Sequence, residues 1–183
     1  AESVGEQYKI NKGWDIKCIP NGASLPLWKR NLEEKQALKK ELGLQEGIKY
    51  FIFVGRFSQE KNPDVLFKAF EKLQRKDAAL IMLGMGNMWQ PLKDCCPDNI
   101  IMPGFTTRVY DYMKASDYYI SASDVEGLAN TILESMSVGL PMLLSDIPSH
   151  REILANVKEG SIGYLIDNHC PEDIRTKIDK IMN

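Results

Sequence analysis

The sequence lacks the features that mark membrane-spanning and nucleic-acid-binding proteins. No apolar run in its 183 residues approaches the ~20 residues that a membrane-spanning helix needs. Lysine and arginine number 23 against 25 aspartates and glutamates, a formal net charge of −2, whereas a nucleic-acid-binding domain usually carries a basic stripe. We therefore expect no membrane span and no nucleic-acid partner.

Cysteine is scarce, and the sequence contains no Asp-x-Asp. The cysteines show no metal-ligand spacing, and we interpret them as reduced thiols of a cytoplasmic protein. They are Cys18, Cys95, Cys96 and Cys170. These absences leave a metal-chelating site without support.

The length bounds the number of domains. At roughly 150 residues per domain, we expect a single domain over residues 1–183. A chain of this size buries about 70% of its unfolded surface, so it needs no disulfide or metal to fold. It opens with AESVGEQYKI, with neither an initiator methionine nor a signal peptide, so we expect a piece of something longer.

Short apolar runs alternate with amphipathic segments of helical length. The runs expected to be strands are 16–20, 50–55, 79–84, 99–104, 118–123, 141–146 and 163–167. The segments expected to be helices are 29–43, 64–76, 108–116, 128–139, 149–157 and 172–182. Several runs are almost wholly apolar, as strands buried on both faces are. The alternation predicts an α/β fold, a Rossmann-like doubly wound parallel sheet with helices on both faces.

Local signals support two helix boundaries. Asn62-Pro63-Asp64 places an N-cap residue, a proline at the first helical position and an acid in the first turn. Gly139-Leu140-Pro141 places glycine where the chain must turn left-handed and proline where a helix cannot continue. Because ligands of open α/β sheets bind outside the carboxyl ends of the strands, the residues that follow the strands are the candidate site residues.

The loop after strand 50–55 carries two cations. Gly55 permits close approach of a ligand, and Arg56 and Lys61 lead to a helix N-terminus, where two cations and free helix amides form an anion cradle. The alternative is a solvated loop whose charges pair with Glu60 or Asp64. From this loop alone, the solvated alternative is favoured.

The loop after strand 79–84 contains two glycines. Gly84-Met85-Gly86 resembles the start of a dinucleotide-binding fingerprint, but Trp89 stands in place of the third glycine. A tight turn into a helix capped by Asn87 is the better interpretation of this loop by itself.

Two acids flank the start of the helix expected from about residue 128. Glu126 lies just before it and Glu134 nearly two turns inside it. Eight helical residues would separate them by roughly 12 Å, too far for a glycosidase pair. The spacing suits a ligand with hydroxyl-rich ends and an anionic middle, because carboxylates accept hydrogen bonds from sugar hydroxyls. An exposed Glu134 and a surface-turn Glu126 are an equally good interpretation of the spacing.

Together these motifs resemble the C-terminal, donor-binding half of the GT-B fold retaining glycosyltransferases of group 1 (GT4). The matching segments are Ile19-Pro20-Asn21-Gly22, VGRFSQEKN (54–62), LGMG (83–86), IIMPGF (100–105), the stretch 116–141, Ser145-Asp146 and Gly163-Tyr164. The most specific element is Glu126-x7-Glu134, combined with Gly55-Arg56-x4-Lys61 upstream.

The resemblance implies roles at a sugar-nucleotide donor. Arg56 and Lys61 would neutralise the diphosphate, and Glu126 would contact hydroxyls of the transferred sugar. Donor-binding roles fall on residues of the neighbouring loops: Gly55, Gly84, Gly86, Pro103, Gly104, Phe105, Gly127, Leu128, Ala129 and Glu134. In this set the amides of 127–129 would meet the phosphates, Glu134 would hold the ribose and 103–105 would lie beside the base. The sequence departs from the family at 128–130, where many relatives have a second aromatic-glycine step.

The resemblance also implies a reaction. It is a retaining, metal-independent transfer of a hexose from a UDP-sugar, or next GDP-mannose, to a glycan or lipid-linked acceptor in polysaccharide biosynthesis. We expect no cofactor, a remnant of the interdomain connection over 1–14, and an absent N-terminal acceptor domain, so that the chain alone turns over little or nothing. The alternatives are a GT-B-like sugar-nucleotide epimerase or phosphorylase half, and a non-catalytic nucleotide-binding module.

One helix and two histidines lie outside these motifs. Helix 29–43 carries basic and acidic runs, and a solvated face is the first interpretation; its basic clusters leave open a peripheral association of the full-length enzyme with the inner face of a membrane. His150 is interpreted as a helix-start residue with ordinary hydrogen bonds, with a place in the cleft as the alternative. His169 lies in a polar turn and is given no role.

Overall fold

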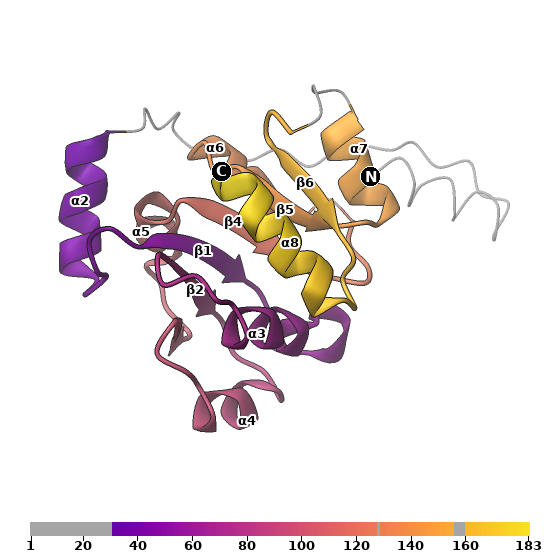
Figure 1. Ribbon diagram of the computed structural model, residues 1–183, viewed down its shortest axis with the longest axis horizontal. Coiled ribbons are helices and arrows are strands. Elements are labelled where there is room, and N and C mark those ends of the chain that lie inside the picture. The colour runs from indigo at the N-terminus through magenta and orange to yellow at the C-terminus, as the bar shows by residue number, and fades with distance from the viewer. Residues whose placement is uncertain (1–30, 128, 156–159) are drawn as a thin grey trace, which may run out of the picture.

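The structure, a computed structural model, describes residues 31–127, 129–155 and 160–183. In these ranges six parallel strands form one sheet in the order β3-β2-β1-β4-β5-β6 (Figure 1). They are β1 (Lys49–Val54), β2 (Ala78–Leu83), β3 (Ile100–Gly104), β4 (Tyr118–Ser121), β5 (Met142–Ser145) and β6 (Gly163–Ile166). The strands expected from residue 50 onward are confirmed. The strand expected at 16–20, the motif at 19–22, the segment 1–14 and Leu128 lie outside the described residues.

Helices connect the strands as the alternation predicted. They are α2 (Leu32–Glu41), α3 (Pro63–Glu71), α4 (Trp89–Asp94), α5 (Val109–Ala115), α6 (Asn130–Ser137), α7 (Pro148–Ala155) and α8 (Pro171–Met182), with a 3-10 turn, η1 (Gln59–Lys61), before α3. None of these helices is long and apolar enough to cross a membrane. The α/β, Rossmann-like fold class is confirmed.

The sheet is covered on both faces. Phe51 and Phe53 of β1 pack into one core with residues of α3 and α8, and these two helices lie in front of the sheet in Figure 1. Tyr50 and Ile52 pack into a second core with residues of α5 and α6. Successive side chains of a strand point to opposite faces, so a strand between two helical layers must be apolar throughout.

The two expected helix boundaries are present, with one difference. Asn62 is the N-cap of α3, but its backbone is left-handed (φ 47°) and its side chain makes no capping bond. Its amide group instead donates to the carbonyl oxygen of Ala122 at 2.9 Å. Gly139 has φ +71°, the left-handed turn predicted for it. The cap expected at Asn87 is wrong, since Met88 is the N-cap of α4 and no side chain caps it.

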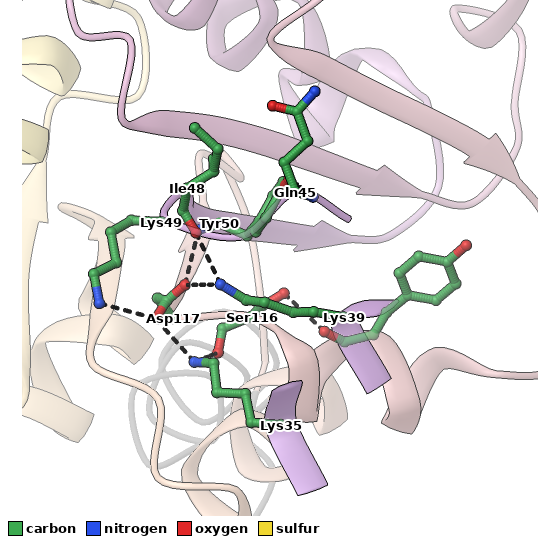
Figure 2. A network of polar contacts seen from close by, with 9 residues as sticks. Lys35, Lys39, Gln45, Ile48, Lys49, Tyr50, Ser116 and Asp117 are labelled. Carbon is green, nitrogen blue, oxygen red and sulfur yellow. Dashed lines mark hydrogen bonds and ion pairs between the residues drawn. The ribbon is translucent and has the colours of Figure 1, made fainter. Parts of the chain in front are cut away.

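Helix α2 is held at the amino end of the sheet by buried charges (Figure 2). Nζ of Lys35 lies 2.9 Å from one carboxylate oxygen of Asp117, and Nζ of Lys39 lies 3.4 Å from the other. Burial alone would raise the pKa of Asp117, but Lys35, the Tyr50 amide and Lys39 hold it below its ordinary value. The solvated-face interpretation is therefore wrong for Lys35, which is 5% exposed because its ammonium neutralises a buried carboxylate.

Candidate functional site

The sheet has a switch point between β1 and β4. Strands β2 and β3 extend it on one side and β5 and β6 on the other, while β1 pairs directly with β4. The loops that follow these two strands, the β1 loop (55–62) and the β4 loop (122–127), leave the same edge of the sheet. They touch, because the amide of Asp124 donates to the carbonyl oxygen of Glu60 at 2.9 Å. Open α/β sheets bind ligands at such a point.

An ion pair joins the two loops. Nζ of Lys61 contacts Oε1 of Glu126, and the same oxygen accepts a hydrogen bond from Oγ of Ser123 at 2.9 Å. The side chains of Lys61 and Glu126 are 23% and 15% exposed, so water screens the pair only partly. In the solvated alternative both cations pair with Glu60 or Asp64; here Lys61 contacts Glu126 instead, although the charges of Lys61 and Arg56 still help to lower the pKa of Glu60. The Lys61–Glu126 contact brings two of the predicted site residues together.

Two further charged side chains near the switch point make no direct polar contact in the described ranges. The guanidinium of Arg56 is exposed, and the carboxylate of Glu134 in α6 is half-buried; neither makes a hydrogen bond or an ion pair there. An unpaired guanidinium can bind a phosphate in a bidentate way, and an unpaired carboxylate can accept from hydroxyls.

The carboxylates of Glu126 and Glu134 both lie near Tyr119. This buried phenol lies 3.0 Å from Oγ1 of Thr131 in α6. Burial raises the pKa of Tyr119, and the nearby carboxylates of Glu126 and Glu134 raise it further. Thr131 and Glu134 are three residues apart on α6 and therefore share a face of that helix. Glu134 itself is half-buried, so it is not the exposed helix residue of the alternative interpretation.

The glycines after β2 are required by the neighbouring backbone. A Cβ on Gly84, whose φ is +128°, would lie 2.0 Å from the carbonyl oxygen of Gly55, and one on Gly86 would lie 2.3 Å from that of Phe57. Close packing of the two loops thus explains both residues without a ligand. A Cβ on Gly127 would meet nothing within 4 Å, so this glycine leaves open space beside its backbone.

Residues 103–105 lie on the same edge but farther along it. Pro103 and Gly104 end β3 and Phe105 follows it, and β3 is separated from β1 by β2 in the sheet. Pro103 and Phe105 are exposed, the latter by 78%, while Gly104 is buried. Sequence reasoning missed two other exposed apolar side chains on this edge, Met85 at 47% and Val125 at 72%, because an isolated apolar residue in a loop carries no pattern.

Helix α6 starts slightly later than expected. Its N-cap is Ala129, with an extended backbone (φ −67°, ψ 126°), and its first helical residue is Asn130. Ala129 therefore stands at the helix N-terminus beside the β4 loop, where free amides favour an anion.

Hydrogen bonds behind the β4 loop were also missed by sequence reasoning. Nδ2 of Asn62 donates to Oδ1 of Asp124 at 2.6 Å, and Oγ of Ser145 donates to the carbonyl oxygen of Ser123 at 2.7 Å. The first bond holds the loop to the β1 loop and the second to β5. The one signal in the sequence is the presence of serines at the ends of apolar strands, since buried hydroxyls need partners.

Metal-ligating side chains do not gather in the part of the chain that the structure describes. No group of three or more histidine, cysteine, aspartate or glutamate side chains is placed there to hold an ion. Cys95, Cys96 and Cys170 are free thiols. The groups available to a ligand at the switch point are therefore cations, carboxylates and backbone amides.

A family model described as "Glycosyl transferases group 1" matches residues 34–183. A curated relative, the UDP-Gal:alpha-D-GlcNAc-diphosphoundecaprenol alpha-1,3-galactosyltransferase of Escherichia coli, is 27% identical over 180 residues, covering 92% of this chain and 46% of the relative. The chain spans less than half the length of the curated relatives it matches.

Solved structures share the fold. A glycosyltransferase from Rickettsia africae ESF-5 matches with a TM-score of 0.83 at 20% identity, covering 100% of this chain and 52% of that one. The Anabaena protein HepE in complex with UDP and glucose matches with a TM-score of 0.77 at 19% identity, covering 91% and 47%. At such identities the likeness shows the architecture of the sheet and its helices.

Proposed function

The chain belongs to the glycosyl transferases group 1 family, and on that premise we propose that it is the donor-binding half of a retaining glycosyltransferase. The enzyme would move a hexose from a nucleoside-diphosphate sugar to a glycan or lipid-linked acceptor. The observation that carries the proposal is the set of charges at the switch point, where Arg56 and the Lys61–Glu126 pair stand on adjoining loops and Glu134 on the helix behind them.

Donor binding exchanges the partners of the Lys61–Glu126 pair. Lys61 donates to a phosphate oxygen in place of the carboxylate, and the released Glu126 accepts from hydroxyls of the transferred sugar. Arg56 has no contact to break and holds the diphosphate through its planar guanidinium. The two cations then oppose the negative charge that builds on the departing nucleoside diphosphate, which lowers the free energy of the transition state.

The nucleoside lies toward α6 and β3. Glu134 accepts hydrogen bonds from the ribose diol, and the exposed ring of Phe105 flanks the base. The amides of Gly127 and Ala129 meet the phosphates at the N-terminus of α6. The open space beside Gly127 supports this assignment.

A UDP-sugar is the favoured donor, with GDP-mannose second. The name of the Escherichia coli relative contains UDP-Gal, and the HepE complex holds UDP and glucose. We propose a metal-independent reaction, since two side-chain cations supply the positive charge and the sequence contains no Asp-x-Asp.

The acceptor belongs to another part of the protein. Because the curated relatives are more than twice as long as the matched region, we assign acceptor binding to an N-terminal domain joined through residues 1–14. The chain alone then binds the donor and turns over little or nothing. The full-length enzyme works in the cytoplasm, at the inner face of the membrane when its acceptor is lipid-linked.

A titration panel tests the proposal. UDP, GDP, ADP and TDP are titrated into the chain by isothermal calorimetry, and melting temperatures are measured with each nucleotide and with NAD. UDP should bind most tightly and raise the melting temperature, because a ligand of the native state at 100 times its Kd adds about 2.7 kcal/mol of stability. Equal shifts from UDP, GDP and NAD would reject the donor site.

Product analysis on the full-length protein separates the alternatives. A sugar-nucleotide epimerase consumes UDP-GlcNAc without transfer to an acceptor, and a phosphorylase half needs phosphate as its co-substrate. A nucleotide-binding module shows no turnover even when the N-terminal half is present.

A further inference from the structure

His150 is a buried imidazole in the first turn of α7, immediately after β5. It is 0% exposed, and its Nδ1 lies 3.0 Å from Oγ and 3.1 Å from the carbonyl oxygen of Ser145. The interpretation of His150 as a helix-start residue with ordinary hydrogen bonds holds for this nitrogen. Its Nε2 is buried and has no hydrogen-bond partner in the described ranges. A buried unpaired nitrogen costs stability, which favours a role beyond packing.

The hydrogen bonds around Ser145 determine the tautomer of His150. The Ser145 hydroxyl donates its proton to the carbonyl oxygen of Ser123 at 2.7 Å. The hydroxyl has only this one proton to donate, and the Ser145 carbonyl oxygen has none. Both oxygens must therefore accept from the imidazole, so Nδ1 carries the proton. His150 is therefore the Nδ1–H tautomer, with the lone pair on Nε2.

These bonds connect His150 to the site. His150 holds Ser145, Ser145 holds the backbone of Ser123, and Oγ of Ser123 donates to Glu126 at 2.9 Å. Both serines between His150 and Glu126 are buried, so water competes little for the bonds that they make. A chain of hydrogen bonds thus runs from His150 on α7 to the Glu126 carboxylate.

The imidazole also lies within the electrostatic reach of the site. Burial lowers the pKa of His150, the Ser145 carbonyl and Glu126 raise it, and Lys61 lowers it. Because the net direction is downward from an ordinary value of 6.5, the imidazole is neutral at neutral pH. It adds no third charge to the Lys61–Glu126 pair.

We propose that His150 is a positioning residue of the donor site, which acts through Ser145 and Ser123 to hold Glu126 where the hydroxyls of the transferred sugar bind. The inference rests on the proposed function, since it needs a sugar at Glu126. Glu126 meets the sugar and not the nucleotide, so loss of His150 weakens the binding of a sugar nucleotide while leaving that of the bare nucleotide unchanged.

The experiment compares the Kd of UDP-glucose with that of UDP by calorimetry. In His150→Leu, which keeps the volume and removes the donor, UDP-glucose should bind at least about fivefold more weakly, the effect of one lost hydrogen bond, with UDP within about twofold of the wild type. His150→Asn, which keeps an N–H near the position of Nδ1, should restore most of the loss. An equal loss for both ligands, or no loss, would overturn the inference.

A second pair of variants covers the case in which His150→Leu does not fold. Ser145→Ala removes the middle of the chain and should show the same selective loss for UDP-glucose. Ser149→Ala is the matched control, because this neighbouring serine is also buried but its hydroxyl has no partner in the described ranges; both affinities should be unchanged. Glu126→Ala shows the largest loss of UDP-glucose affinity that the hydrogen-bond chain can cause. An unchanged Kd for UDP-glucose in that variant would show that Glu126 does not contact the sugar, and the inference would then be wrong.

The tautomer gives a readout that needs no ligand. Nitrogen-15 spectra of the side chain at neutral pH should show a proton on Nδ1 of His150 and none on Nε2, and the opposite tautomer would overturn the hydrogen-bond chain. A wild-type chain that binds neither UDP nor UDP-glucose would overturn the proposed function itself, which the variants do not address.

Discussion

At the scale of single residues, two glycines of the matched motifs have different surroundings, which indicate different reasons for the absence of a side chain. Gly84 is held against the Gly55 carbonyl in a left-handed conformation, whereas Gly127 borders open space. Glycines in one motif can therefore serve either close packing of the backbone or free space for a ligand. Only the surroundings of each glycine in the folded structure show which of the two applies.

Gly84→Ala and Gly127→Ala should have opposite effects. Gly84→Ala should destabilise the protein by about 2 kcal/mol or more, because its Cβ would overlap backbone at a positive φ. Gly127→Ala should change stability by less than about 0.5 kcal/mol but weaken UDP binding, since the methyl group occupies the space given to the phosphates. Chemical denaturation and calorimetry measure the two effects. If Gly127→Ala bound UDP as the wild type does, the phosphates would have to lie elsewhere.

Glu134 offers a second test at this scale. Its carboxylate has no partner in the described ranges, so Glu134→Ala should change the unfolding free energy by less than about 0.5 kcal/mol. Loss of the ribose contact should weaken UDP binding by about tenfold or more, as for hydrogen bonds to a charged group. Glu71→Ala, which removes an exposed acid from the end of α3, is the control for net charge. Equal affinities in the two variants would make Glu134 a surface residue.

At the scale of elements, one buried carboxylate links α2 to the sheet. Asp117 at the start of β4 pairs with Lys35 and Lys39 of α2 and accepts from the Tyr50 amide of β1 at 3.0 Å. It therefore joins a helix to two neighbouring strands at the end of the sheet opposite the candidate site. Its loss should loosen α2 without altering the charges that face the donor.

Asp117 should also make the fold sensitive to acid. Its folded-state pKa is lowered from 3.8, so the ionised carboxylate contributes stability that is fully present above pH 3.8 and is lost as pH falls through the lower folded value. Asp117→Asn should cost about 3 kcal/mol at neutral pH, because it leaves buried ammonium groups uncompensated, and should flatten the decline of stability in acid. Urea unfolding at neutral pH and near pH 3 measures both. An unchanged acid profile in the variant would assign the sensitivity to other carboxylates.

At the scale of the whole molecule, the switch point places cations on one loop opposite an acid on another. If these cations alone oppose the charge of the leaving group, the full-length enzyme should keep its transfer rate in excess EDTA, within about twofold. The matched measurement is Lys61→Met, which should lower the rate by about a hundredfold or more through lost transition-state stabilisation. Activity abolished by EDTA and restored by Mg²⁺ or Mn²⁺ would contradict metal independence.

The apolar runs and their spacing were sufficient to predict the strands from β1 to β6, because a strand buried on both faces must be apolar throughout. The roles of Glu126 and Glu134 at the donor stay predictions, drawn from their spacing in a motif that resembles the family's. The pairing of Lys61 with Glu126 was not predictable from spacing, since it joins residues 65 positions apart. The burial of Lys35 was not predictable for the same reason, as its partner lies 82 positions away.

The sequence by itself determined the class of fold and the family, since both follow from local alternation and from short motifs. Only the tertiary structure decided which charges meet, which glycine borders free space and which histidine stands behind the β4 loop. The physical reason is that hydrogen bonds and ion pairs act over a few ångströms in space. The folded sheet alone brings the ends of β1, β4 and β5 that close together.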